Sequence, residues 1–300
     1  MPIYIKYVYR YIFVVNRFRK NKEGESVENI KIGDIVTRNS DNNNILFYVE
    51  DIIKSRGMMP VAILKGVTIR IEVSSSLEDI RLENKSIVKS EIQKFDNNID
   101  SRARRLLEYY NQKSESRKIF SDNNCLIMHL DGDRKYAEKS ARIYDRFRLQ
   151  AIVKNIKENR QPFEIRNLLN KYNPDIVVIT GHDGMIKKGY RYNDIYNYRN
   201  SKYFVKTVQE IRNWEQGENR IAVFAGACQS YYEAIISAGA NFASSPARIL
   251  IDFMDPIIVA QRIANTPEAQ YLRIEDIKEN LRDGERGISG IGSFGKLELG

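Results

Sequence analysis

The chain has 300 residues, of which 42% are hydrophobic and 10% aromatic, and its 48 basic and 39 acidic residues give a formal net charge of +9. This composition excludes an intrinsically disordered chain and predicts one large or two ordinary folded domains. Because Cys125 and Cys228 are its only cysteines, the sequence excludes a disulfide-rich scaffold and favours a reducing compartment.

The first part of the chain predicts a short extension followed by a small β domain. Residues 1–26 begin with alternating Ile, Tyr and Val, which favours a strand, and Lys6 and Arg10 interrupt the apolar run that a cleaved signal peptide would need. Over residues 27–83, β-rich runs alternate with the turn clusters NSDNNN and SRGMMP. The phrase IGDIV before a polar turn is common at the start of SH3-like barrels, so we expect a small SH3-like β-barrel that binds or tethers.

Residues 84–118 form the next segment, which is charged and lacks Gly and Pro. Its apolar residues recur at broken helical spacing, which predicts a partly exposed helical linker. The stretch RARRLLEYY within it is also compatible with a basic nucleic-acid-binding helix, although we prefer the solvated linker. The apolar positions are Ile87, Ile92, Phe95, Leu106, Leu107 and Tyr110.

From residue 119 to residue 300, predicted strands alternate with predicted helices, which indicates a parallel sheet covered on both faces. In such sheets ligands and chemistry lie beyond the carboxyl ends of the strands. The glycine-rich tail at residues 283–300 leaves close packing, a mobile loop and a final edge strand open. The expected strands cover residues 125–131, 175–180, 220–225 and 247–254, and the expected helices cover residues 134–158, 161–172, 199–216, 229–240 and 256–265.

Two of these strands end in the residue types of a thiol nucleophile and its base. His182 follows DIVVIT between Gly181 and Gly184, and Cys228 follows RIAVFA and precedes a predicted helix. A cysteine attacks a carbonyl as the thiolate, so it needs a base or a positive neighbour, and a helix N-terminus adds partial positive charge. We predict His182 as the base, Cys228 as the nucleophile, and the amides of Gly184 and Cys228 as the oxyanion hole.

Taken separately, Cys228 could be a small buried residue of the core and His182 an ordinary loop residue. Their occurrence at equivalent strand ends favours a catalytic role for the pair. Zinc is the other alternative, because Cys125, His129, His182 and Cys228 are four potential ligands. Cys125 and His129 lie four residues apart on one strand, about 13 Å along it, which is too far for one tetrahedral ion. We therefore expect no metal and no cofactor, and expect Cys125 and His129 to pack within the sheet.

The turn LDGD ends the first strand of this domain and places Asp131 and Asp133 at the same edge as His182 and Cys228. Two carboxylates there are suited to a pocket for a cationic side chain such as arginine. Either of them is equally suited to cap the helix that starts near residue 134, and one aspartate can serve both purposes. Asp183 is a further candidate, for orienting the His182 imidazole.

The order strand–His–Gly followed by strand–Ala–Cys resembles that of the caspase-like cysteine peptidases, in which a histidine and a cysteine at neighbouring strand ends form a catalytic dyad. This sequence departs from the pattern because Asp183 stands between His182 and Gly184. The resemblance implies a caspase-like three-layer α/β/α domain with a mainly parallel sheet over residues 119–300. It also implies that Asp131 or Asp133 lines an arginine-specific pocket.

A second resemblance, to the YabG family of sporulation-specific proteases, covers nearly the whole chain from about residue 28. It implies a cysteine endopeptidase with His182 as base and Cys228 as nucleophile that cuts spore-coat and related spore proteins after arginine. Residues 224–251 are its most specific part. The resemblance is carried by IGDIVTRNSDNNNILFYV, HLDGD, PDIVVITGHDG, FAGACQSYYEAIISAGANFASSPARILI and DPIIVAQRIA.

Further expectations about partners follow. The resemblance implies spore proteins as substrates and a place in the cytoplasm of the sporulating cell, at the developing spore or its coat. The net charge would attract acidic partners or nucleic acid, but no nucleic-acid-binding signature is present, so we expect no such partner. No apolar run in the sequence is long enough to span a bilayer, and the oligomeric state stays open.

The remaining predictions concern two serines after the Cys228 motif and the arginines of the linker. Ser244 and Ser245 in ASSPAR are candidates for contacts with the substrate backbone. Self-cleavage is expected in the basic linker, and the alternative from another class is a non-catalytic coat-associated or nucleic-acid-binding scaffold protein. The candidate sites of self-cleavage are Arg102, Arg104, Arg105 and Arg117.

Overall fold

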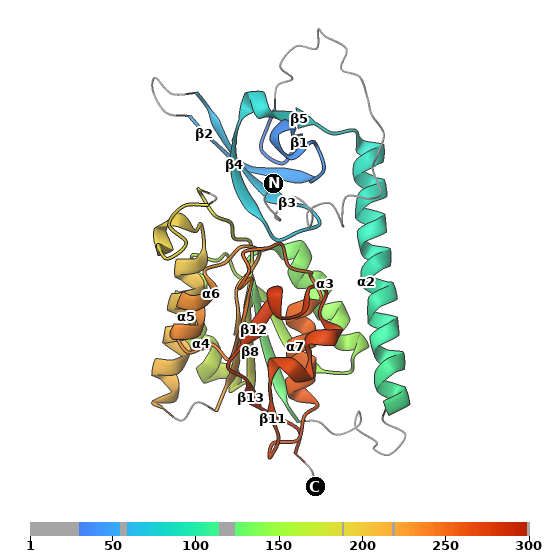
Figure 1. Ribbon diagram of the computed structural model, residues 1–300, viewed down its shortest axis with the longest axis vertical. Helices are drawn as coiled ribbons and strands as arrows, with labels where there is room; N and C mark the ends of the chain where they lie inside the picture. The colour runs from blue at the N-terminus through green and yellow to red at the C-terminus, as the bar shows by residue number, and fades with distance from the viewer. Residues whose placement is uncertain (1–29, 55–58, 114–123, 188, 218–219, 299–300) are drawn as a thin grey trace. The chain divides into compact units, whose positions relative to one another are not determined.

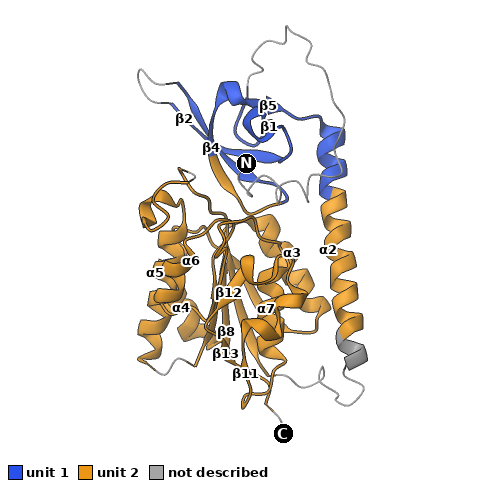
Figure 2. Cartoon of the chain, viewed as in Figure 1, with its two compact units in different colours: residues 1–68, 74–92 blue, residues 69–73, 93–300 orange. Residues whose placement is uncertain are grey.

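The computed structural model describes residues 30–54, 59–113, 124–187, 189–217 and 220–298 (Figure 1). The expected extension at residues 1–26 lies outside the described residues. The chain divides into two compact units, unit 1 (residues 1–68 and 74–92) and unit 2 (residues 69–73 and 93–300), which Figure 2 colours separately. Across the described ranges, every helix is too short or too polar to cross a bilayer.

The N-terminal sheet is antiparallel and has five strands in the order β4-β3-β2-β1-β5. Its inward positions alternate along the strands, so that Val36, Phe47, Val49 and Leu64 are fully buried. A 3-10 helix at Asn39–Asp41 follows β1, and another at Leu77–Asp79 precedes β5. The strands are β1 (Ile35–Arg38), β2 (Phe47–Ile53), β3 (Val61–Gly66), β4 (Glu72–Ser76) and β5 (Ile80–Leu82).

The helix expected in the linker is α2, Lys85–Lys113. Ile99, Ala103 and Leu106 recur on one side of it and join the core cluster of unit 2. The helix therefore belongs to the folded core over its second half, because a stripe of apolar side chains there is removed from water.

Unit 2 is built on a six-stranded sheet in the order β12-β10-β9-β8-β6-β7. All neighbouring strands are parallel except β12, which pairs antiparallel to β10. The order reverses direction between β6 and β8, which is where open α/β sheets bind their ligands. The strands are β6 (Leu126–Asp131), β7 (Gln150–Asn155), β8 (Ile176–Thr180), β9 (Ala222–Ala225), β10 (Phe242–Ser244) and β12 (Ile288–Gly290).

Helices cover both faces of this sheet, as Figure 1 shows. Alternate strand residues divide between two core clusters: Val178 and Phe224 pack with α3, α7 and part of α2, whereas Val177 and Val223 pack with α4, α5 and α6. This confirms the predicted α/β class with a mainly parallel sheet flanked by helices. The helices are α3 (Arg134–Arg146), α4 (Gln161–Tyr172), α5 (Ser201–Glu215), α6 (Tyr232–Ser237) and α7 (Asp255–Ala264).

Short elements complete the unit. A two-stranded sheet pairs β11 (Tyr271–Leu272) with β13 (Ser293–Phe294). The glycine-rich tail contributes β12, so of the three alternatives the edge strand is the one observed over that part of it. The 3-10 helices are Ile195–Asn197, Ile274–Asp276, Lys278–Asn280 and Gly284–Arg286.

Three predicted elements were wrong in their bounds or type. The helix expected over residues 134–158 ends at Arg146, because Arg148 has a left-handed backbone (φ 55°) and the β-branched run after it forms β7. The helix expected from residue 229 begins at Tyr232, after Gln229 at φ 57°. The strand expected over residues 247–254 is irregular, because Arg248 has φ 54° and buried apolar residues there fill the core without joining the sheet.

Candidate active site

The parallel pairing of β8 and β9 brings the two predicted catalytic positions to the same edge of the sheet. Ile179 lies opposite Ala225 in this pairing, and His182 and Cys228 each lie three residues beyond their own member of that pair. Both side chains are fully buried. The sequence therefore places the imidazole and the thiol at equivalent strand ends, as expected from the two motifs.

Direct hydrogen bonds tie the two strand-end loops together. The Ser230 hydroxyl donates to Asp183 Oδ2 at 2.8 Å and accepts from the Ala227 amide at 2.9 Å. The Met185 amide donates to Gln229 Oε1 at 3.3 Å. Asp183, directly after His182, and Gln229, directly after Cys228, are thus each held by a partner on the other loop, which ties the two loops together.

Asp183 organises these loops through its carboxylate. Oδ1 accepts from the amides of Gly184 and Asn200, each at 2.8 Å, and Oδ2 accepts from the hydroxyls of Ser201 at 2.5 Å and Ser230 at 2.8 Å. Burial raises the pKa of Asp183 to about 6 even though these hydrogen bonds favour the charged form. These partners assign the carboxylate to holding the loops and not to orienting the His182 imidazole.

Glu158 holds the backbone of the histidine and was missed from the sequence. Its Oε1 accepts from the His182 amide at 2.7 Å, and the residue is only 4% exposed. A Cβ atom at Gly132 or Gly181 would meet this carboxylate at 2.1 or 2.4 Å. The two glycines therefore leave the space that Glu158 occupies, and they were the signal in DGD and TGHD that a third group approaches there.

The Cys228 thiol is protonated at neutral pH in this state. Burial raises its pKa to about 11, although the Ile251 amide donates to its Sγ at 3.4 Å and favours the thiolate. The Tyr136 ring contacts His182 with centroids 5.7 Å apart. Burial raises the pKa of Tyr136, and a Cys228 thiolate is close enough to raise it further. Tyr136 therefore neighbours both predicted catalytic residues.

Asp131 forms a buried ion pair at this edge of the sheet. Its Oδ2 lies 2.6 Å from Nη2 of Arg70, with Asp131 fully buried and Arg70 2% exposed. Thr180 donates to the same oxygen at 2.8 Å. Burial alone would raise the pKa of Asp131, but the Arg70 guanidinium holds it below the usual value. Two aromatic rings complete the surroundings, since the guanidinium carbon lies 4.9 Å from the Tyr136 centroid and 5.1 Å from that of Phe253.

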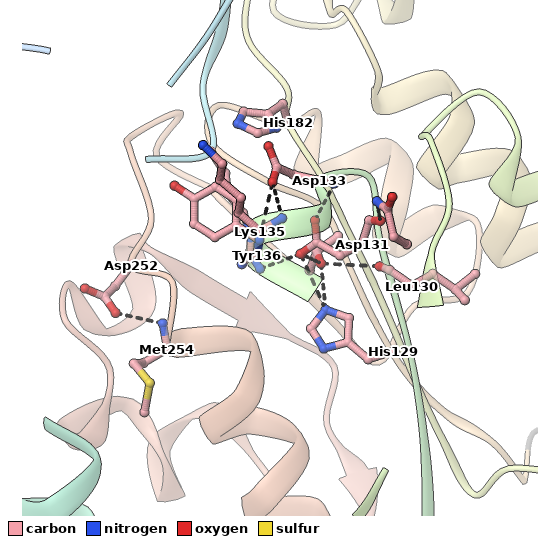
Figure 3. A network of polar contacts seen from close by, with 12 residues as sticks. His129, Leu130, Asp131, Asp133, Lys135, Tyr136, His182, Asp252 and Met254 are labelled. Atoms are coloured by element: carbon pink, nitrogen blue, oxygen red, sulfur yellow. Dashed lines mark hydrogen bonds and ion pairs between the residues drawn. The ribbon is translucent and has the colours of Figure 1, made fainter. Parts of the chain in front are cut away.

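Asp133 has a different role. It is the N-cap of α3, and its Oδ1 accepts from the amides of Lys135 at 2.8 Å and Tyr136 at 3.3 Å. Figure 3 shows Asp131 and Asp133 with Tyr136, His182 and His129 around them. The two aspartates of LDGD thus divide the functions that the sequence left open: Asp133 caps the helix, and Asp131 binds a guanidinium.

Ser244 and Ser245 both reach the loop that carries Cys228. The Ser244 hydroxyl donates to the Ala227 carbonyl at 2.9 Å. The Ser245 hydroxyl accepts from the Gln229 amide at 3.0 Å and donates to the Ile249 carbonyl at 2.7 Å. Both hydroxyls therefore support the loop that carries Cys228, and their contacts with a substrate stay a prediction.

His129 lies inside the sheet and not in the candidate site. Its Nδ1 is 3.1 Å from the Tyr144 hydroxyl, and its Nε2 is 2.7 Å from that of Thr180. Burial lowers the pKa of His129 to about 3, so the imidazole is neutral. Cys125, directly before β6, is also buried. Among the described residues, no group of three or more His, Cys, Asp or Glu side chains is arranged to hold a metal ion.

The neutral state of His129 predicts a pH dependence of stability. Below about pH 6.5 the unfolded chain protonates this histidine and the folded chain does not, so the free energy of unfolding falls by up to about 1.4 kcal/mol per pH unit as pH decreases toward 3. In His129→Gln this contribution is absent. We expect urea unfolding to show that wild type loses about 2 kcal/mol more than the variant between pH 6.5 and 5.

Asp183 and Asp255 also titrate in that window, because burial raises both pKa values to about 6. A raised carboxyl pKa has the opposite sign, since it stabilises the folded chain as pH decreases. Both groups are common to the two proteins, so the difference between them isolates His129. Equal pH slopes for wild type and variant would contradict a neutral His129.

Comparison with known proteins identifies the class of protein to which this fold and site belong: it is a peptidase. The profile of the YabG peptidase U57 family matches residues 31–300. The chain is 32% identical over 281 residues to the sporulation-specific protease YabG of Bacillus subtilis (strain 168), covering 90% of this chain and 97% of that protein. No solved structure matches it.

The chain belongs to the YabG peptidase U57 family. This confirms the resemblance to that family and favours a sporulation-specific protease over a non-catalytic scaffold. A protease acts on protein substrates.

Proposed function

We propose that this chain is a cysteine endopeptidase with a His182–Cys228 dyad that cleaves spore-coat and related spore proteins after arginine. The observation that supports it best is the Asp131 carboxylate, which binds a guanidinium at 2.6 Å beside the two strand ends. Tyr136 and Phe253 contact that guanidinium through their rings. A carboxylate and aromatic rings are the groups that select arginine in a buried pocket.

In the proposed reaction, His182 takes the proton of the Cys228 thiol and the thiolate attacks the carbonyl carbon that follows the bound arginine side chain. The carbon–nitrogen bond then breaks, His182 returns the proton to the leaving amine, and a thioester to Cys228 remains. Water hydrolyses the thioester and regenerates the thiol. The pKa of Cys228, raised by burial to about 11, makes the base necessary, because so little thiolate is present at neutral pH.

The oxyanion hole that we propose differs from the predicted one in a single donor. The Gly184 amide donates to the Asp183 carboxylate at 2.8 Å, so it is engaged in this state. The amide of Asp183, the residue directly after His182, donates to a peptide carbonyl, that of Arg70, at 3.4 Å. We therefore propose the amides of Asp183 and Cys228 as the donors, with Gly184 providing space for the substrate backbone.

The sheet orders support the finer assignments of fold. Five parallel strands with one antiparallel edge strand, and the strand-end positions of His182 and Cys228, favour a caspase-like peptidase domain over residues 119–300. In the five-stranded sheet, β1 pairs with both β2 and β5, and a 3-10 helix precedes β5, which favours an SH3-like barrel over residues 27–83. The similarity to the sporulation-specific protease of Bacillus subtilis supports action in the sporulating cell.

A panel of peptides tests this function. The peptides differ only in the residue before the bond to be cleaved, which is arginine, lysine, citrulline or norleucine. Mass spectrometry of the products locates the cleaved bond. We expect cleavage after arginine and inhibition by iodoacetamide, with the modified residue mapped to Cys228. Cleavage that survives complete alkylation of Cys228, or that is indifferent to the residue before the bond, contradicts the proposal.

A further inference from the structure

Residues 69–73 of unit 2 lead into strand β4, and the part from Arg70 to Glu72 pairs with the loop after His182. The Glu72 amide donates to the Asp183 carbonyl at 2.9 Å, and the Asp183 amide donates to the Arg70 carbonyl at 3.4 Å. Between them, Ile71 forms a parallel β-bridge with Asp183. Peptide substrates commonly bind by adding such a strand, with main-chain hydrogen bonds giving affinity and side-chain pockets giving specificity.

The approach of this strand explains Gly184. A Cβ atom at Gly184 would lie 2.3 Å from the Glu72 carbonyl oxygen, so a side chain there is incompatible with the strand. The peptide backbone that Gly184 admits here is a segment of the same chain.

The Arg70 side chain occupies the pocket that we propose for a substrate arginine. Its guanidinium pairs with Asp131 at 2.6 Å and contacts the rings of Tyr136 and Phe253. In the part of the chain that the structure describes, Nε and Nη1 of Arg70 are buried with no hydrogen-bond acceptor. A buried guanidinium with one paired nitrogen adds little to the stability of the fold, because burying a charge with few partners costs free energy.

The backbone of Arg70 lies beside the nucleophile. Burial raises the pKa of Cys228, and a hydrogen bond from the Arg70 backbone is among the interactions that oppose the rise. The Arg70 side chain thus pairs with Asp131, its backbone contacts the Cys228 thiol, and its carbonyl oxygen accepts from the Asp183 amide. These are the three positions that a substrate arginine needs before cleavage of the bond that follows it.

The linker arginines lack such an arrangement. Arg102, Arg104 and Arg105 lie within α2, so their backbone is helical and would have to unfold to bind as a strand. Arg102 also pairs with Asp255 at 2.7 Å. Arg117 lies outside the described residues. Of the arginines described, Arg70 is therefore the better candidate for self-cleavage.

We propose that residues 69–73 are an internal substrate and that the chain cleaves its own Arg70–Ile71 bond. The proposal rests on the proposed function, since it uses the same thiol, base and pocket. Cys228 Sγ bonds to the Arg70 carbonyl carbon, the bond to the Ile71 nitrogen breaks, and that nitrogen takes the proton held by His182. Water then hydrolyses the thioester, which leaves an Arg70 carboxylate and an Ile71 amine.

The full chain tests this directly. Purified protein is incubated and sampled over time for mass under denaturing conditions, with N-terminal sequencing of the products. We expect fragments of residues 1–70 and 71–300, a new N-terminus reading Ile-Glu-Val, and a rate that is independent of protein concentration because the segment is held in its own cleft. Fragments that begin elsewhere, with the Arg70–Ile71 bond intact, overturn the proposal.

Matched variants separate the bond from the fold. Arg70→Gln is expected to abolish the cut at this position, Arg70→Lys to slow it at least tenfold, and Arg81→Gln, an exposed arginine on β5, to leave it unchanged. Cys228→Ala should keep the chain intact. If Arg70→Gln fails to fold, the time course of the wild-type chain and the Arg70→Lys variant decide the question.

Assaying arginyl peptides in the same samples distinguishes the two proposals. Cleavage of such peptides by a wild-type chain whose Arg70–Ile71 bond stays intact overturns the internal substrate and leaves the proposed function standing. The absence of both reactions overturns the proposed function together with the internal substrate. Cleavage after Arg70 that persists in Cys228→Ala identifies another protease and also overturns the proposal.

Discussion

Replacing Cys228 with alanine is expected to lower kcat/KM for cleavage after arginine by about a thousandfold or more, while the chain still folds. The thiol supplies the nucleophile, so its loss removes the covalent route entirely. Its structural contribution is small by comparison, because the hydrogen bonds between Sγ and the Ile251 backbone are long, at 3.4 Å from the amide and 4.0 Å to the carbonyl, and alanine fills nearly the same volume. Circular dichroism and thermal unfolding verify the fold, and the peptide assay measures the rate.

Cys125→Ala is the matched control, because Cys125 is the other cysteine of the chain and is also buried. It precedes β6 at the end of the sheet away from the candidate site, and burial raises the pKa of its thiol above the usual value. We expect a modest loss of stability and an unchanged rate of cleavage. A similar fall in rate for both variants would indicate a general effect of cysteine loss and contradict the assignment of Cys228.

The positions of the two candidate catalytic residues at one sheet edge could be predicted because they depend on local patterns. Apolar β-forming runs locate strands, and in a parallel sheet their carboxyl ends meet at one edge, so His182 and Cys228 could be paired before any coordinates were known. The register of Ile179 with Ala225 supports that inference. The end of α3 was missed because the run after it is only partly buried, so its apolar spacing fits a helix as well as the edge strand β7.

Arg70 could not be found in this way. Its partner Asp131 lies 61 residues further along the chain, and no periodicity connects them. Glu158 was missed for the same reason, although Gly132 and Gly181 marked the space that it fills. Side chains that meet through tertiary packing leave only indirect signals in the sequence, such as a glycine where another group approaches closely.

The roles of Asp131 and Asp133 were also beyond the sequence, because two carboxylates in one turn are chemically equivalent. Their positions differ: Asp131 is the last residue of β6 and pairs across to Thr180, whereas Asp133 lies beyond the strand and receives the first amides of α3. A residue inside the ladder is held by the pairing of its strand, and one after it is free to cap a helix.

Asp131→Asn is expected to abolish most of the preference for arginine. The carboxylate is fully buried and binds a guanidinium at 2.6 Å, and removing one partner of a buried ion pair costs about 3–5 kcal/mol. We therefore expect kcat/KM for arginine relative to citrulline to fall by about a hundredfold or more, because citrulline has nearly the same shape without the charge. Asp133→Asn removes the same charge two residues away but keeps the N-cap, so it should leave the ratio nearly unchanged.

The same variant predicts a stability effect that is separate from catalysis. In a Cys228→Ala background, which keeps the chain intact, Asp131→Asn leaves the Arg70 guanidinium buried without its carboxylate and should lower the free energy of unfolding by about 3 kcal/mol. Arg70→Met should have a similar cost, because it leaves the Asp131 charge buried. The double variant should lose about 1–3 kcal/mol less of the free energy of unfolding than the sum of the two single losses, since it has no unpaired charge in the pocket.

Strict additivity in that cycle, measured by urea unfolding, would contradict the ion pair as the feature that holds Arg70 in the pocket. The stability cycle could confirm the ion pair while the Asp131→Asn variant keeps its preference for arginine. That outcome would show that substrates bind their arginine elsewhere. The two measurements therefore separate what Asp131 does for its own chain from what it does for a substrate. Asp131 serves both only if a guanidinium from either source lies against the same carboxylate, beside the rings of Tyr136 and Phe253.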